Sequence, residues 1–349
     1  MRWSFRIGTI AGIRVELHVT FLLFVGWVAI SRGLLAGRPA QSLAQVVLLL
    51  MIFACVLLHE LGHALAARRY GIKTRDIVLL PIGGVARLQR MPDRPQQEIV
   101  VALAGPAVNV VIAAGLWVLL GATGRPFAVE VMRGGMPETL LAVNLLMFGF
   151  NLVPAFPMDG GRVLRAILAL RLPYAKATRI ASTVGQAIAL LFGTVGFFYN
   201  PMLMFVALFV FLAAGEEHAM VQTRASLSGL PARAAMLTDF ESLDVSDPLQ
   251  RAVDLLMAGN QQDFPVLDHG APVGVLTRAD LIVALQRTGA ETPVGQVVAR
   301  TGPTAEAGEP LEQVFQRMRE SRASALPVLS GGALVGVVTL ENVTELLLV

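Results

Sequence analysis

The sequence predicts a polytopic α-helical membrane protein, with about six transmembrane helices and a re-entrant hairpin, followed by a soluble α/β repeat pair. The 349-residue chain is 55% hydrophobic and only 15% charged, with a mean hydropathy of +0.64, whereas soluble chains carry about 25% charged residues. Long apolar stretches fill its first part, and an internal repeat occupies its last third. These three observations make an ordinary soluble enzyme an unsuitable interpretation.

Six apolar stretches are candidates for membrane spans, and four of them approach or exceed the ~20 residues that cross a bilayer. They occupy residues 17–35, 45–67, 97–121, 138–154, 180–198 and 201–215. Tyr199, Asn200 and Pro201 predict a tight turn before the last stretch, which is short. No small-residue cleavage site follows the first stretch, so we expect the N-terminal segment to be retained rather than removed as a signal peptide.

A shorter apolar piece at residues 77–88 cannot cross a bilayer. Its Pro81 and its glycine pair, Gly83 and Gly84, suit a bent, re-entrant segment. Such a segment is tolerated at membrane depth only where protein or water covers its backbone. We therefore expect a re-entrant hairpin there.

Charge is distributed unevenly along the chain. Residues 1–225 carry 20 basic and 10 acidic side chains, and residues 226–349 carry 8 and 15. The basic groups gather in alternate connections, which predicts six spans in a cell membrane with both termini cytoplasmic. Three connections are rich in basic residues: Arg2, Arg6 and Arg14; Arg68, Arg69, Lys73, Arg75, Arg87, Arg90 and Arg94; and Arg162, Arg165, Arg171, Lys176 and Arg179. The alternate connections carry only Arg32, Arg38, Arg125 and Arg133.

Two further features exclude other classes of protein. No basic stretch is interleaved with aromatic residues, so no nucleic acid partner is expected. The single cysteine, Cys55, excludes an intrachain disulfide framework.

The acidic part contains a repeat in which three short sequences recur 62 residues later. The pairs are Asp247–Leu249 with Glu309–Leu311, Phe264–Leu267 with Leu326–Leu329, and Gly274–Thr277 with Gly336–Thr339. Each unit predicts a helix, a strand, a turn, a second strand and a second helix. We expect a membrane domain at 1–225 and two repeat domains at 226–290 and 291–349.

A metal-binding pattern ends the second apolar stretch: His59-Glu60-Leu61-Gly62-His63. The spacing of four residues places both histidines on one face of a helix, so that both imidazoles can reach one ion. Glu60 lies beside them, where it can accept a proton from a water molecule on the metal. We expect Gly62 and Gly105 to serve close helix packing rather than chemistry.

A catalytic zinc site requires a third protein ligand, and Asp159 is the best candidate. It follows the fourth stretch, on the side of the membrane where the second stretch ends. Pro154 and Pro157 stop the preceding helix, and Gly160 and Gly161 free the backbone to turn. The competing candidates are His18, Glu216, Glu217 and His218 as polar residues at span ends, and His269 in a solvated turn.

These residues resemble the site-2 protease family of intramembrane zinc metalloproteases. The matching marks are His59–His63, the run from Asn151 through Pro154 and Pro157 to Asp159-Gly160, Pro81–Gly84, and Gly105–Asn109. The resemblance covers about residues 1–220, without a PDZ-like insertion. The six-span layout with a C-terminal repeat resembles the subgroup that carries tandem CBS domains.

The resemblance implies an enzyme that hydrolyses a peptide bond near the cytoplasmic face, in a transmembrane or membrane-associated protein within the lipid bilayer. His59, His63 and Asp159 would bind one Zn²⁺. Glu60 would activate the zinc-bound water and pass its proton to the leaving amine. Asn151 would hold the substrate or the oxyanion, and the re-entrant hairpin would present a backbone edge to an unwound substrate strand.

The repeat resembles a tandem CBS-domain pair, a family in which the corresponding residues contact adenine nucleotides such as ATP or AMP. Here those residues are Thr277 and Asp280 in the first unit, and Thr339 and Asn342 in the second. Asn342 departs from the usual aspartate, which weakens the expected contact with ribose. An alternative hypothesis is that one or both of these nucleotide sites are empty, and that the CBS pair serves only to form a homodimer.

Two functions from different classes follow. The first is a membrane-embedded zinc endopeptidase in regulated intramembrane proteolysis, gated by a nucleotide at the CBS pair. The second is a CBS-gated transporter or channel, which accounts for the spans and the repeat. It gives no reason for two histidines, a glutamate and an aspartate of zinc-enzyme type in the apolar part.

Overall fold

The computed structural model describes residues 3–31, 39–89, 92, 94–123, 135–259, 261–298 and 302–348. Two compact units make up the chain, residues 1–219 and 220–349. The domain boundaries expected at 225/226 and 290/291 stay predictions. Six arginines of the charge pattern lie outside the described residues, namely Arg2, Arg32, Arg38, Arg90, Arg125 and Arg133.

Four helices of the described residues are long and apolar enough to cross a membrane, so the expected count of six spans is not confirmed. They are α2 (Pro39–Arg69), α3 (Pro95–Ala122), α6 (Tyr174–Tyr199) and α7 (Pro201–Leu227). Helix α1 (Val19–Ala29) has 11 residues, and the first two residues of its apolar stretch belong to the strand Ile13–His18. Helix α4 (Met136–Asn151) has 16 residues, which rise about 24 Å, less than the ~30 Å hydrocarbon core.

The turn expected between the last two apolar stretches is confirmed. Helix α6 ends at Tyr199 and α7 begins at Pro201, and the Asn200 side chain accepts a hydrogen bond from the Met202 backbone NH at 3.0 Å. The final helix is not short, because α7 continues for 27 residues to Leu227. Its polar second half carries the helix beyond the end of the apolar stretch.

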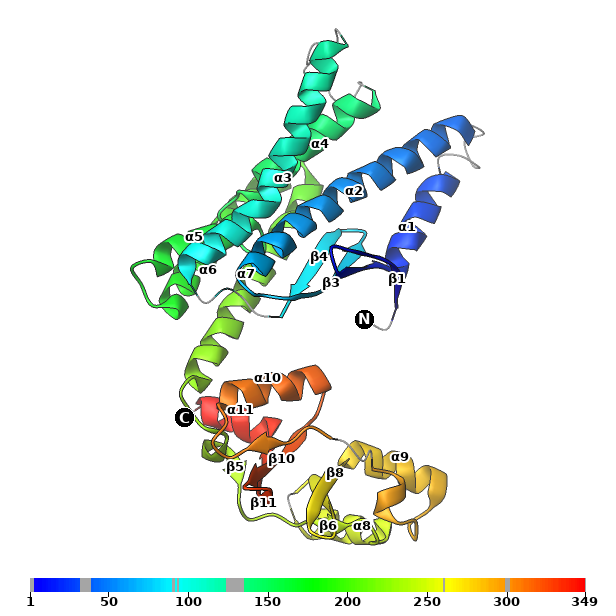
Figure 1. Ribbon diagram of the computed structural model, residues 1–349, viewed down its shortest axis with the longest axis vertical. Coiled ribbons are helices and arrows are strands. Elements are labelled where there is room, and N and C mark those ends of the chain that lie inside the picture. Colours follow the sequence, from blue (N-terminus) through cyan, green and yellow to red (C-terminus); the bar gives the residue numbers. More distant parts are fainter. Residues whose placement is uncertain are drawn as a thin grey trace. The chain divides into compact units, whose positions relative to one another are not determined.

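A four-stranded sheet in the order β1-β2-β3-β4 packs on α2 (Figure 1). The strands are β1 (Ser4–Ile10), β2 (Ile13–His18), β3 (Thr74–Leu80) and β4 (Gly83–Leu88), with β2 and β3 parallel and the other pairs antiparallel. Strands β3 and β4 form a hairpin over residues 77–88, where a re-entrant hairpin is expected, and its re-entrant position in the membrane stays a prediction. The β1–β2 hairpin was not expected; its two-residue turn places Ala11 and Gly12 at positive φ, as tight hairpin turns require.

The second unit confirms the repeat element by element. Its first half contains α8 (Leu249–Ala258), β7 (Asp263–Asp268), β8 (Ala271–Thr277) and α9 (Arg278–Thr288), and its second half contains α10 (Leu311–Ser321), β10 (Ala325–Ser330), β11 (Ala333–Thr339) and α11 (Leu340–Leu348). Both expected turns have positive φ at their two central residues. Strand β10 packs against β7 and β8, so the two halves contact each other, although each has its own hydrophobic core.

The segment that leads into each repeat packs with the other repeat. Leu227 and Ala232 lie in the core of the second half, where the short β5 (Met236–Leu237) pairs with β11. Conversely, Val294 and Val298 lie in the core of the first half. The remaining short strands, β6 (Leu243–Asp244) and β9 (Ala305–Glu306), run parallel to β7 and β10. This exchange ties the two halves together.

Candidate metal centre

The three expected ligands come together from two helices distant in the sequence. His59 and His63 lie one turn apart on α2, and Asp159 is the first residue of α5 (Asp159–Ala169). All three are buried, with 4%, 5% and 6% of their surfaces exposed. The turn before α5 depends on Gly160, because a Cβ there would lie 2.4 Å from the carbonyl oxygens of two earlier residues.

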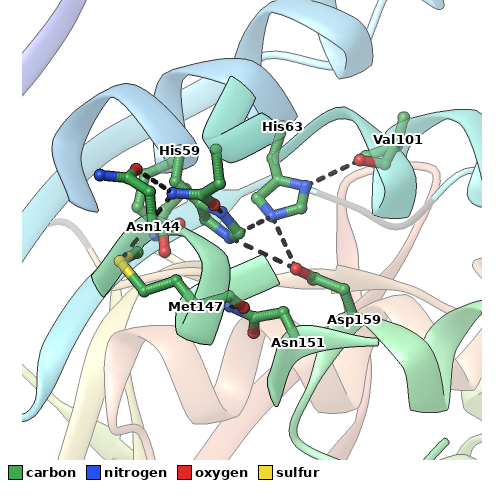
Figure 2. A network of polar contacts seen from close by, with 10 residues as sticks. His59, His63, Val101, Asn144, Met147, Asn151 and Asp159 are labelled. Atoms are coloured by element: carbon green, nitrogen blue, oxygen red, sulfur yellow. Dashed lines mark hydrogen bonds and ion pairs between the residues drawn. The ribbon is translucent and has the colours of Figure 1, made fainter. Parts of the chain in front are cut away.

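The distances between the ligand atoms fit a tetrahedral ion. The Nε2 atoms of His59 and His63 lie 3.1 Å apart, and Asp159 Oδ2 lies 3.3 Å and 3.1 Å from them (Figure 2). Ligands about 2.0–2.1 Å from a tetrahedral zinc lie about 3.3–3.4 Å from one another. These three atoms would therefore hold a tetrahedral zinc ion, and a catalytic ion of this kind would keep one position for water or substrate.

The hydrogen bonds on the far side of each imidazole determine which nitrogen faces the ion. His63 Nδ1 lies 2.7 Å from the backbone oxygen of Val101, which can only accept, so this nitrogen carries the proton. His59 Nδ1 lies 2.6 Å from Asn109 Oδ1 and donates in the same way. Both Nε2 lone pairs are then free to converge on Asp159 Oδ2, which is buried and accepts no hydrogen bond from the described residues. Three converging lone pairs repel one another unless a cation, either a metal ion or a proton, lies between them.

The Asp159 carboxyl is suited to hold that cation. Burial alone would raise the pKa of Asp159, whereas the nearby charge of Arg162 lowers it. A metal ion at the three lone pairs would favour the ionised carboxylate in the same way, and that is the form that binds a metal ion.

Glu60 lies between the histidine pair and the edge of the sheet. The backbone NH of Ala86, on β4, donates a 3.1 Å hydrogen bond to Glu60 Oε2. Gly84 permits this approach, because a Cβ there would lie 2.7 Å from Glu60 Cγ. Strand β4 ends the sheet, so its free edge faces the carboxylate that the sequence singles out as a proton acceptor. The other edge of β4 pairs with β3, and a bidentate ion pair joins the two strands. In it, Arg87 Nε and Nη2 donate to Oδ1 and Oδ2 of the buried Asp76, at 2.5 Å and 2.6 Å.

Gly105 has a different role from the packing role expected of it. A Cβ on Gly105 would lie 2.2 Å from His63 Nε2 and 2.7 Å from His59 Nε2. Helix α3 thus leaves room for the ligand atoms themselves. Gly62 does serve packing, since its Cβ would meet the backbone oxygen of Ala104 at 2.8 Å.

Sequence reasoning gave no role to two residues beside the site, although Asn109 ends the matching run Gly105–Asn109. Asn109 and Asn144 are both fully buried, and Asn109 Nδ2 donates to Asn144 Oδ1 at 2.9 Å. Amides in the middle of apolar helices are costly unless partnered, which is the signal that could have identified them. Asn151, whose role is still a prediction, lies in the same view (Figure 2), and its Nδ2 donates to the backbone oxygen of Met147 at 3.0 Å.

The competing ligand candidates fall outside the group of possible metal ligands, although His218 Nδ1 is buried without a hydrogen-bond partner among the described residues. His18 caps α1, its Nδ1 accepting from the Thr20 NH at 3.3 Å. Glu217 accepts from Arg165, and the His269 side chain is fully exposed in its turn. Among the described residues, the group that could hold a metal ion is His59, His63 and Asp159.

Arg165, in the middle of α5, is fully buried and ties three helices together. Its guanidinium donates to Glu98 of α3, at 2.8 Å through Nε, and to Glu217 of α7. The rings of Phe156 and Tyr174 each lie 5.0 Å from it. Burial alone would lower the pKa of Arg165, but the two carboxylates outweigh burial and raise it. The helix that begins with Asp159 is thereby anchored to α3 and α7.

Comparison with known proteins agrees with this geometry. The profile of peptidase family M50 matches residues 47–139 and 136–192, and the CBS-domain profile matches residues 232–287 and 294–349. Zinc metalloprotease MJ0392 of Methanocaldococcus jannaschii is 35% identical over 79% of this chain and 78% of its own length. The chain belongs to peptidase family M50. This is the site-2 protease family, so the protein is a metallopeptidase with a C-terminal CBS pair.

Two further comparisons concern the extent of the family match. Rip3 of Mycobacterium tuberculosis, named as a zinc metalloprotease, is 31% identical over 99% of this chain and 93% of its own length, so it spans both units. A solved site-2 protease from Methanocaldococcus jannaschii is 38% identical, covering 62% of this M50 chain and 95% of that chain, with a TM-score of 0.46.

The nucleotide-contact candidates of the CBS pair occupy equivalent helix starts. Thr277 caps α9 and accepts from the Asp280 NH at 3.1 Å, while its hydroxyl donates to the Asp280 carboxylate at 2.7 Å. Thr339 accepts from the Asn342 NH at 3.1 Å and also donates to the Asn342 side chain. Both pairs stabilise a helix N-terminus, so capping alone accounts for these contacts, and nucleotide binding stays a prediction.

Proposed function

We propose that this M50 protein cleaves a membrane-bound protein in or near a transmembrane segment, at the cytoplasmic side of the cell membrane, in regulated intramembrane proteolysis. The observation that carries the proposal is the buried triangle of His59, His63 and Asp159, with the Glu60 carboxylate beside it. We assign both chain termini to the cytoplasm, on the support of the arginine-rich connections.

In this proposal His59, His63 and Asp159 hold one zinc ion. When bound, zinc supplies a Lewis acid that polarises the scissile carbonyl and makes water acidic enough to deprotonate near neutral pH. Glu60 accepts the proton of the attacking water and returns it to the leaving amine. Asn151 binds the substrate carbonyl through its amide NH₂ group, after exchanging its hydrogen bond to Met147.

The substrate binds as an added strand on β4. The contact between the Ala86 NH and Glu60 supports this, because it orients the free edge of the sheet toward the carboxylate. An extended peptide on that edge would bring its carbonyls near Glu60. A helical substrate must unwind first, because its carbonyls already accept hydrogen bonds within the helix.

The decisive experiment is co-expression with candidate single-span membrane proteins. Wild-type protein should cleave a true substrate, and Glu60→Gln, which keeps the shape and removes the proton acceptor, should lower cleavage at least ~100-fold. Glu291→Gln, at an exposed position in the second unit, is the matched control and should cleave as wild type does. Cleavage by Glu60→Gln at the wild-type rate would refute the mechanism.

The CBS pair, with Thr277, Asp280, Thr339 and Asn342, is proposed to bind an adenine nucleotide and regulate cleavage, and to form a homodimer. The helix starts that these residues cap support it, since helix N-termini favour phosphate. ATP or AMP should change the cleavage rate of wild-type protein, and Asp280→Ala should remove the change. An unchanged rate, together with no nucleotide binding to the full chain, would leave the pair with dimerisation alone.

The interpretation as a CBS-gated transporter or channel is not favoured, because the M50 relatives are named as zinc metalloproteases. It still has a direct test. Reconstituted protein that conducts ions and cleaves no membrane protein would revive it.

A further inference from the structure

A polar relay crosses three apolar helices behind His59. His59 lies on α2, Asn109 on α3 and Asn144 on α4, and both amides are 0% exposed. Two amides buried in apolar helices cost several kcal/mol unless each finds partners. The relay satisfies them and ends on the imidazole that faces the metal centre.

The relay has a fixed direction, which starts at a backbone carbonyl. Asn144 Nδ2 donates to the Leu140 oxygen at 2.9 Å. Asn144 Oδ1 therefore faces Asn109 and accepts from its Nδ2 at 2.9 Å. Asn109 Oδ1 in turn faces His59 Nδ1 at 2.6 Å. Because the Leu140 oxygen can only accept, every later donor and acceptor in the relay is determined.

We propose that Asn144 is a positioning residue of the metal centre, which locks the Asn109 amide and through it the tautomer of His59. An amide can rotate by half a turn and exchange its oxygen and nitrogen at little steric cost. Rotated, Asn109 would direct an NH₂ group at His59 Nδ1. The imidazole would then carry its proton on Nε2, where it blocks the metal. Asn144 opposes this rotation because its Oδ1 offers Asn109 Nδ2 an acceptor in one orientation only. Met147 Sδ, at 3.9 Å, is a second and weaker acceptor on the same side.

His63 provides an internal contrast. Its Nδ1 faces the backbone oxygen of Val101 at 2.7 Å, and a backbone carbonyl cannot exchange donor for acceptor. The metal centre therefore has one ligand oriented by the main chain and one that depends on side chains. Only the second needs a lock.

The test measures zinc affinity of the full chain in detergent, by competition with a chromogenic chelator. Asn144→Leu should weaken zinc binding about 10–100-fold, as loss of outer partners of a metal ligand does. Asn144→Asp is the matched variant, because a neutral aspartic acid can accept from Asn109 and donate to the Leu140 oxygen. It should stay within about threefold of wild type. Cys55→Ala removes the other atom near Asn144 Nδ2 and should also stay near wild type.

The Asn109→Asp variant, used as a second background, separates the effect of Asn144 on the His59 tautomer from its effect on packing. In Asn109→Asp, the carboxylate has no NH₂ group to turn toward His59, so rotation cannot reverse the relay. Adding Asn144→Leu to that background should change zinc affinity less than about threefold. An equal loss in both backgrounds would overturn the proposal, and so would wild-type affinity in Asn144→Leu alone.

The inference rests on the proposed metal centre, and the two can fail separately. His59→Ala should abolish tight zinc binding whatever Asn144 does. Zinc retained by His59→Ala would refute the metal centre itself. Zinc lost by His59→Ala but retained by Asn144→Leu would refute only the lock.

Discussion

Gly105→Ala is the sharpest test of the metal centre, because it adds one methyl group where the ligand atoms converge. The added Cβ would lie 2.2 Å from His63 Nε2 and 2.7 Å from His59 Nε2. Ordinary contacts of this kind need about 3.4 Å or more, so one ring or α3 must move by about 1 Å. A shift of that size disrupts ligand geometry, which tolerates about 0.2 Å.

We therefore expect Gly105→Ala to bind zinc at least ~100-fold more weakly and to lose cleavage in proportion. The assay is zinc content after dialysis against a chelator, with cleavage measured on the same sample. Gly115→Ala, on the same helix, is the matched control because no atom lies within 4 Å of its Cβ. It should keep zinc and gain up to about 1 kcal/mol in stability, as helix glycines replaced by alanine do.

Stability measurements complete this test. Gly62→Ala also introduces a clash, 2.8 Å from the Ala104 oxygen, but on the packing side of α2. It should lower the unfolding temperature, while any folded fraction still binds zinc. If Gly105→Ala retains zinc and cleaves as wild type does, the atoms that converge at α3 are not a metal site, and the argument from their geometry is wrong.

Three further outcomes follow. Gly84→Ala should lower cleavage at least ~10-fold with zinc content unchanged, since its Cβ would press on Glu60. Gly8→Ala, in open space in the same sheet, is the control and should have no effect on cleavage. Equal losses of cleavage in the two variants would contradict the role of β4. Arg165→Met should lower the free energy of unfolding by about 3–5 kcal/mol, because it leaves buried carboxylates unpaired. Thermal unfolding measures this, with Arg171→Met at an exposed position as the control. Identical unfolding curves for the two variants would show that the ion pairs of Arg165 do not stabilise the protein. Chelation should abolish cleavage and added zinc should restore it; activity in metal-free protein would exclude a metal-dependent reaction.

The sequence by itself determined the features that depend on spacing along one chain segment. The interval between His59 and His63 places both on one helix face, whatever surrounds the helix. The 62-residue offset of the repeat predicted two equivalent α/β halves, and the structure contains both. The prolines before Asp159 predicted a helix break, and α5 does begin at that residue. The M50 and CBS resemblances rested on the same local patterns.

Hydropathy was a weaker guide to the ends of the elements. It records where apolar residues lie, so it began the first expected span at residue 17, although Leu17 and His18 end a strand. It also counted α4 as a span, although this helix has 16 residues. It also ended α7 where the apolar residues end, although the helix continues to Leu227. A backbone can change from strand to helix inside one apolar run, because both forms satisfy their hydrogen bonds.

Only the tertiary structure decided which residues of other helices and of the sheet surround His59 and Glu60. Gly105, Asn109 and Asn144 act on His59 from helices 46 to 85 positions further along the chain, and Ala86 reaches Glu60 from a strand. No local pattern specifies such contacts, because they exist only after α2, α3, α4 and the sheet have packed together. Covalent spacing placed the two histidines on one face, and packing determined which atoms surround them, which tautomer they adopt and how much room is left for an ion.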